Sequence, residues 1–408
     1  MRKEEKGITL VALIITIVVM LILVAVSINI LVNSNLIGHA EKTGEAYAGA
    51  IKNEEKLGND GITINDKEYA SIDDYIESRK PLPEGVGKKF TETKEYTDGT
   101  KTAVIPGGFT VSGIRNETRI DDGLVIYLIP DDEIENVKWD GTEKTKYDQF
   151  VWIPVTEVNK MFMCQSKTAD TECNIELVNG KPTCTNHSNS KYMAGRLYAT
   201  DTGENFDSRL TTQTYNANSG LREPAIVTGN ADGTGTKYDG GGSNNIELTL
   251  ATLQEEYNNA VKKVIESKGF WIGRYETSGM SISSSSDSTT ILSVVAGKGT
   301  SDGINNVNWY RMYKQQQNYA SQKSLDTSKI QSTMVFGAAY DQTMLFANCA
   351  NETTSTKNYS TVITGNVETD CYKNIYDICG NLMEWTTEAY DAYCRVVRGR
   401  RLLQKYLC

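Results

Sequence analysis

The chain has 408 residues, a hydrophobic fraction of 39% and a net charge of −10 at pH 7. This length suits one large domain with appendages, or two to three domains. The 42 Lys and Arg residues are scattered without a basic stripe, which argues against binding of a nucleic-acid backbone. The two histidines, His39 and His187, are too few for a His-rich metal centre.

The N-terminus combines a short charged leader, residues 1–7, with residues 8–32, which carry no charge. A helix of that length is roughly 38 Å long, enough to cross a hydrocarbon core of about 30 Å with some tilt. A secretory signal peptide has a shorter apolar region. The sequence therefore predicts a single membrane span in contact with lipid. Arg2, Lys3 and Lys6 precede the span, so the positive-inside rule predicts a cytoplasmic N-terminus and an extracellular remainder.

The junction of leader and span, KG followed by ITL, resembles the type IV prepilin leader, in which a peptidase cleaves after a glycine on the cytoplasmic side. The resemblance implies cleavage between Gly7 and Ile8 by a prepilin peptidase, and contacts with other pilin subunits. Ala12 stands at the fifth mature position, where the family usually has Glu, and this departure argues against assembly into a true pilus. An uncleaved signal anchor is the alternative.

The sequence after the predicted span divides into three segments of different composition. Residues 35–57 are rich in Ala, Glu and Lys and extend the helical pattern, so we predict one long helix over residues 8–57. Residues 58–89 are polar and turn-rich, with one short helical piece at 71–78, and are predicted to form a linker. The remainder, residues 90–408, is predicted to form a folded domain.

This domain alternates short apolar runs with long polar stretches. Runs rich in Val, Ile and aromatic residues, bounded by Gly, Pro and Asp, predict strands at 102–113, 123–130, 149–155 and 269–279. Apolar residues at helical spacing predict amphipathic helices at 248–269 and 333–347. No regular alternation of βαβ units is present, so the sequence predicts an α+β fold with many loops.

The most informative stretch is residues 375–390, IYDICGNLMEWTTEAY. It places the turn dipeptide Gly380-Asn381 before large apolar residues that include Trp385, with a single acid, Glu384, among them. Because an unpaired buried charge is costly, this arrangement indicates a buried or half-buried carboxylate with a defined partner. A surface turn followed by an ordinary amphipathic segment is the alternative.

Five segments occur in the order QFVWIPV, GFWIGRYETS, TMVFGAAYDQTMLFA, NIYDICGNLMEWT and RVVRG. Together they resemble the formylglycine-generating-enzyme, or sulfatase-modifying-factor, family over roughly residues 100–399. GNLMEW is the most specific part, since it is similar to the family's G-N-V-W-E-W. The resemblance implies an irregular, loop-rich C-type-lectin-like fold with little regular sheet and two helices. The residues that match the family's structural motifs are Gly380, Asn381, Glu384, Trp385 and Arg398.

The family contains oxidases and binding proteins, and the C-terminus bears on the choice between them. The oxidases use a copper-binding pair of cysteines beyond an R-G-G motif. Here Arg400 follows Arg398 and Gly399, and the segment that would carry the pair is missing, so we expect no enzymatic activity. Residues 400–408 show no closing strand of the family's kind. We therefore expect a domain that is incomplete at its C-terminus, for example through a frameshift near codons 399–400.

Some family members bind calcium beside the G-N-V-W-E-W turn. Asn381 and Glu384 match those positions and offer the hard oxygen ligands that Ca²⁺ prefers, so the resemblance implies a possible calcium site there. The alternative is structural: Asn381 caps a turn, and Glu384 pairs with an arginine such as Arg274 or Arg398.

These observations predict a membrane-anchored, pilin-like cell-surface protein that displays a non-catalytic, lectin-like domain to an unknown extracellular ligand. No nucleic-acid partner is expected. Two other functions stay open. A structural pilin or pseudopilin subunit would need a helix register that packs in a filament, and Ala12 argues against it. A sulfatase-modifying oxidase would need the missing cysteine segment.

Overall fold

A computed structural model describes the chain in ranges separated by gaps. They are 62–64, 67–164, 174–185, 193–195, 237–238, 245–246, 250–279, 292–297, 309–348, 363–365, 370–378, 383–389, 395–399 and 405–407. The predicted leader, the membrane helix and the Gly7–Ile8 cleavage site lie outside them. Within them, every helix is too short or too polar to serve as a membrane span.

The chain divides into two compact units, Met1–Pro81 and Leu82–Cys408. The described part of the first unit consists of an antiparallel hairpin, β1 (Ile62–Ile64) and β2 (Lys67–Tyr69), followed by helix α3 (Ile72–Arg79). Helix α3 confirms the helical piece predicted at 71–78. The boundary between the units falls inside the predicted linker.

The second unit contains a four-stranded antiparallel sheet in the order β14–β7–β6–β5. Its strands are β5 (Thr110–Val111), β6 (Val125–Leu128), β7 (Asp148–Pro154) and β14 (Gly269–Gly273). Strands β5, β6 and β14 lie within runs predicted as strands from their Val, Ile and aromatic content, and β7 begins one residue before the run predicted at 149–155. Close packing explains the glycine at residue 269, because a Cβ atom there would lie 2.2 Å from the Trp152 ring.

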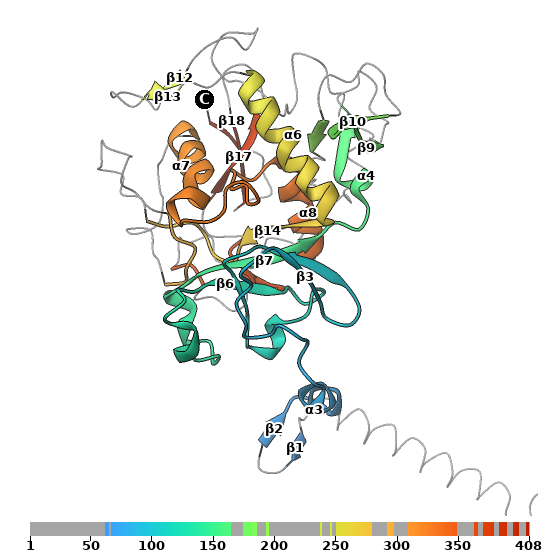
Figure 1. Cartoon of the computed structure of the whole chain (residues 1–408), viewed down its shortest axis with the longest axis vertical. Coiled ribbons are helices and arrows are strands. Elements are labelled where there is room, and N and C mark those ends of the chain that lie inside the picture. Colours follow the sequence, from blue (N-terminus) through green and yellow to red (C-terminus); the bar gives the residue numbers. More distant parts are fainter. Residues whose placement is uncertain are drawn as a thin grey trace, which may run out of the picture. The chain divides into compact units, whose positions relative to one another are not determined.

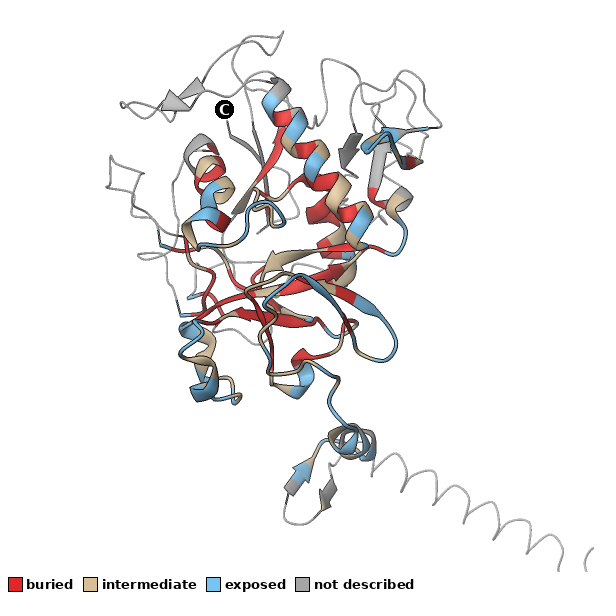
Figure 2. Ribbon diagram, viewed as in Figure 1, coloured by how far each residue is buried: buried red, intermediate tan, exposed pale blue. Residues whose placement is uncertain are grey.

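Alternate residues of the central strands enter two different cores, which is the period-2 pattern of a sheet buried on both faces. Val151 and Ile153 of β7 pack in one core with Tyr340. Trp152, between them, packs in the other core with Ile105. Figure 2 shows buried residues running through this sheet and along the helices that accompany it.

Three helices lie on one side of the central sheet in Figure 1: α6 (Leu250–Ser267), α7 (Trp309–Gln322) and α8 (Gly337–Ala347). Helix α6 confirms the helix predicted at 248–269. Helix α8 begins four residues later than the start predicted at 333. Helix α7 was not predicted, so the expectation of two helices is wrong.

A second sheet has three antiparallel strands in the order β17–β18–β19: β17 (Met383–Ala389), β18 (Arg395–Gly399) and β19 (Lys405–Leu407). Residues 400–408, where no closing strand of the family's kind is expected, thus contain one short strand, β19. One edge of β18 pairs with β17, and the other edge pairs with β19, which contains Tyr406, a residue type that favours strands.

The other described elements are short. Helix α4 spans Val158–Met161, and the paired strands are β3 (Lys94–Thr97) with β4 (Thr102–Ile105), β8 (Phe162–Cys164) with β11 (Met193–Gly195), β9 (Ile175–Val178) with β10 (Lys181–Cys184), β12 (Lys237–Tyr238) with β13 (Asn245–Ile246), and β15 (Cys371–Tyr372) with β16 (Ile375–Tyr376). The described chain is thus mixed α+β with several small antiparallel sheets, in agreement with the predicted class.

Candidate functional site

The predicted motif residues fall on the second sheet. Glu384 and Trp385 lie on β17, Arg398 lies on β18, and the strand register sets Glu384 opposite Arg398. Trp385 is half-buried and packs against the cluster of buried side chains that includes Trp309 of α7. Gly380 and Asn381 lie outside the described residues.

Arg398 is the centre of a buried ion-pair network. Its Nε and Nη2 atoms donate hydrogen bonds to the carboxylate of Glu388 at 2.9 and 2.7 Å, and its Nη1 lies 3.4 Å from Oδ1 of Asp341. The guanidinium carbon also lies 5.7 Å from the centre of the Tyr340 ring. Two carboxylates therefore face one arginine, whose planar fork suits the bidentate pair with Glu388.

Glu388 is further fixed by the start of α8. A Cβ atom at Gly337, the first residue of that helix, would lie 2.4 Å from the Glu388 carboxylate. The backbone N–H groups and dipole of a helix N-terminus favour a negative charge there. Thr386 adds a hydrogen bond from its hydroxyl to Oε2 of Glu388 at 3.0 Å.

Arg274, which directly follows β14, forms a second buried network. Its Nη1 lies 2.7 Å from Oε1 of Glu117 and donates to Oε1 of Gln149 at 3.0 Å and to the Tyr127 hydroxyl at 3.2 Å. The other Glu117 oxygen accepts hydrogen bonds from Ser112 and Tyr127 at 2.6 and 3.0 Å. This arginine therefore joins the central sheet to the segment that precedes β6.

No ion pair joins Glu384 to Arg274 or Arg398 in the described part of the chain, although such a pair was the structural alternative to a calcium site. Each arginine is already paired with other acids, Glu117 in one case and Glu388 and Asp341 in the other. Glu388 lies four residues after Glu384 on the same strand, next to the start of α8, and takes the place at Arg398 that this alternative gave to Glu384.

Glu384 instead lies in an acidic environment. Its Oε2 atom is buried and has no hydrogen-bond partner among the described residues. Burial raises the pKa of Glu384 well above its usual range, and the negative charges of Glu276, Asp377 and Asp370 raise it further. The carboxyl group is thus held in surroundings that favour its protonated form.

Asp377 is a second buried acid of this region, with an exposed fraction of 0%. Its Oδ2 accepts hydrogen bonds from the Thr364 hydroxyl at 2.6 Å and the Gly365 amide at 3.1 Å. Burial is the main cause that raises the pKa of Asp377. In the described part of the chain, no three His, Cys, Asp or Glu side chains are arranged to hold a metal ion. Since Asn381 lies outside that part, the calcium site stays a prediction.

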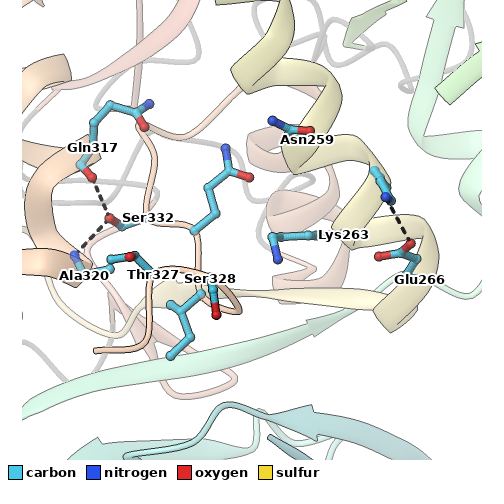
Figure 3. Close-up of a pocket in the computed structure, with 11 residues that line it drawn as sticks. Asn259, Lys263, Glu266, Gln317, Ala320, Thr327, Ser328 and Ser332 are labelled. Carbon is cyan, nitrogen blue, oxygen red and sulfur yellow. Dashed lines mark hydrogen bonds and ion pairs between the residues drawn. The ribbon is translucent and has the colours of Figure 1, made fainter. Parts of the chain in front are cut away.

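A pocket of about 480 Å³ lies elsewhere, between α6 and the connection from α7 to α8 (Figure 3). On one side it is lined by Asn259, Lys262, Lys263 and Glu266 of α6. Sequence reasoning assigned no role to these residues. The sequence signal that could have identified them is their spacing of three and four residues along α6, which places them together on the polar face of this amphipathic helix.

No protein-family model matches the chain, and comparisons with curated proteins and with solved structures also find no match. The resemblances to prepilins and to the formylglycine-generating-enzyme family therefore rest on the quoted motifs.

Proposed function

We propose that this protein is a membrane-anchored, pilin-like cell-surface protein that displays a non-catalytic, lectin-like ligand-binding domain. The observation that carries the proposal is the sequence of residues 8–32, which has no charged residue and precedes a large, compact α+β unit, Leu82–Cys408. An apolar stretch of this length is best accommodated in a bilayer.

Two further observations support a binding domain over an enzyme. The buried arginines Arg274 and Arg398 are both committed to ion pairs that join elements of the fold, so neither is available to a reacting group. The pocket beside α6 is lined by polar side chains that can hold a ligand by hydrogen bonds.

The test is a topology and processing experiment on the full chain in a host that expresses prepilin peptidase. We expect the chain in the membrane fraction, with residues after the span open to protease added outside the cell. Mass spectrometry should find a mature N-terminus at Ile8, and Gly7→Val should retain the leader. Gly58→Val, in the predicted linker, is the matched control and should leave cleavage unchanged.

Two outcomes separate the alternatives. A chain recovered in the soluble fraction would refute membrane anchoring. Filaments seen by electron microscopy, built from this chain and lost together with cleavage, would favour the structural pilin subunit.

A further inference from the structure

We infer that the pocket between α6 and the α7–α8 connection binds a small hydroxyl-rich anion, of the chemical class of acidic sugars. The inference names a ligand class for the displayed domain, and it rests on the proposed function only for the extracellular origin of that ligand. The residues that carry it are all in the second unit.

The wall formed by α6 supplies positive charge and hydrogen-bond donors. Figure 3 shows Asn259 and Lys263 projecting from α6 toward the α7–α8 connection. Lys263 donates one hydrogen bond to the backbone carbonyl of Lys329 at 2.9 Å, which leaves two of its three N–H donors for a ligand. Lys262 is 3.9 Å from Glu266, and both side chains are about half exposed, so this pair is weak and open to exchange.

The opposite wall supplies hydroxyl and amide groups on a fixed backbone. Ser332 accepts a hydrogen bond from the Ala320 amide at 3.0 Å and donates to the Gln317 carbonyl at 3.1 Å. Gln331 donates to the Glu256 carbonyl at 3.1 Å, which ties the connection to α6. The shape of the pocket is therefore set before any ligand enters.

Two lining side chains keep their full hydrogen-bonding capacity. Within the described ranges, neither Asn259 nor Thr327 makes a side-chain hydrogen bond, although both line the pocket. An amide and a hydroxyl each offer both a donor and an acceptor, which matches the hydroxyl groups of a sugar. A volume of about 480 Å³ is within the range of small-molecule sites.

The charge of the lining favours an anion. The lining contains two lysines, Lys262 and Lys263, and one carboxylate, Glu266, so it carries a net positive charge in a chain whose net charge is −10. A carboxylate on the ligand gains charge-assisted hydrogen bonds with the lysines, whereas a cation would meet like charge. Ile330, which is partly exposed, adds an apolar surface that suits the C–H face of a sugar ring.

The experiment is calorimetric titration of the purified full chain with glucuronate and with glucose. The two sugars differ only at C6, which is a carboxylate in glucuronate and a hydroxymethyl group in glucose. We expect saturable binding of glucuronate and at least about tenfold weaker binding of glucose, which lacks the charge-assisted hydrogen bonds. Lys262→Met should also weaken glucuronate binding by about tenfold. Lys181→Met, at an exposed lysine of β10 outside the pocket, is the control and should bind like the wild type.

A second variant tests the location. Asn259 is exposed on α6, so Asn259→Trp should fold, which its thermal unfolding will verify, while the indole fills the pocket and abolishes binding. Equal binding of glucose and glucuronate, unchanged binding by Asn259→Trp, or no saturable binding of glucuronate would each overturn the inference. If the chain is displayed on the cell surface but does not bind glucuronate, only the inference about the pocket ligand is refuted. If the chain is soluble but binds glucuronate, only the proposed membrane display is refuted.

Discussion

At the scale of single residues, two arginines account for much of the buried charge in the second unit. Arg274 neutralises Glu117, and Arg398 neutralises Glu388 and faces Asp341. Removing one member of such a pair leaves an uncompensated buried charge, which costs about 3–5 kcal/mol. The structural role of these residues therefore limits which substitutions the fold tolerates.

Gly337 is the residue at which close packing opposes local propensity. Alanine inside a helix is normally favoured over glycine by about 1 kcal/mol. At residue 337 the added Cβ would lie 2.4 Å from the Glu388 carboxylate, so we expect Gly337→Ala to lower the free energy of unfolding by about 1–3 kcal/mol. Chemical denaturation measures this change. A stabilised variant would show that Glu388 is not held against the start of α8.

Glu384 should make stability depend on pH. Its pKa in the folded chain is raised above the ordinary 4.5, so the folded state binds this proton more tightly than the unfolded state. That contribution is fully present below pH 4.5 and is lost as the pH rises through the folded-state pKa. We expect Glu384→Gln, which cannot ionise, to be more stable than the wild type at pH 7, as measured by thermal unfolding.

The same variant tests the predicted calcium site. If Asn381 and Glu384 hold calcium, added Ca²⁺ raises the melting temperature of the wild type and leaves Glu384→Gln unchanged. The exposed Glu92 offers a control, since Glu92→Gln should respond to Ca²⁺ like the wild type. A melting temperature that Ca²⁺ leaves constant in all three proteins would refute the site.

At the scale of elements, the sequence predicts best where composition and pattern agree. Strand β7 and helix α6 were both predicted, because one is rich in β-branched and aromatic residues and the other has apolar residues at helical spacing. Helix α7 was missed because its sequence, WYRMYKQQQNYASQ, is dominated by polar residues. The buried positions Trp309, Met312 and Tyr313 do have helical spacing, and this was the overlooked signal.

The candidate sites were harder to predict than the elements. Arg274 pairs with Glu117, which is far away in the sequence, and no local pattern identifies such a partner. For Glu384, apolar neighbours indicated a buried or half-buried carboxylate with a defined partner. The burial is confirmed, but Oε2 has no hydrogen-bond partner among the described residues and the surroundings are acidic. The pocket joins α6 to a connection about sixty residues later, so only the folded chain brings its two walls together.

Helix α7 offers a matched pair of tyrosines for testing its docking. The Tyr319 hydroxyl donates to Oδ2 of Asp148 on β7 at 2.7 Å. The buried Tyr313 hydroxyl has no hydrogen-bond partner in the described ranges. We expect Tyr319→Phe to lower the free energy of unfolding by about 1–3 kcal/mol, and Tyr313→Phe to be neutral or stabilising. Equal losses in urea denaturation would contradict this placement of α7.

At the scale of the whole molecule, the division at residues 81 and 82 predicts where the chain is cut by proteases. Leu82 has an exposed fraction of 41% and follows Pro81 at the boundary between the two units. Boundaries between compact units are preferred sites of proteolysis. Brief digestion with subtilisin should therefore yield a stable fragment that begins near residue 82, identified by mass spectrometry. Rapid cleavage within 100–160 instead would contradict a compact second unit.

The position of Arg398 along the chain has a consequence for synthesis. Asp341 and Glu388 are translated before Arg398. Both acids therefore lack this ion-pair partner until residue 398 has been added. Domains that complete their core late leave apolar surface open to aggregation while translation proceeds at about 5–20 residues per second. A chain that ends between residues 388 and 398 would contain Asp341 of α8 and Glu388 of β17 without the arginine that pairs with them. Strand β18 thus supplies the positive charge that completes the buried ion-pair network of the second unit.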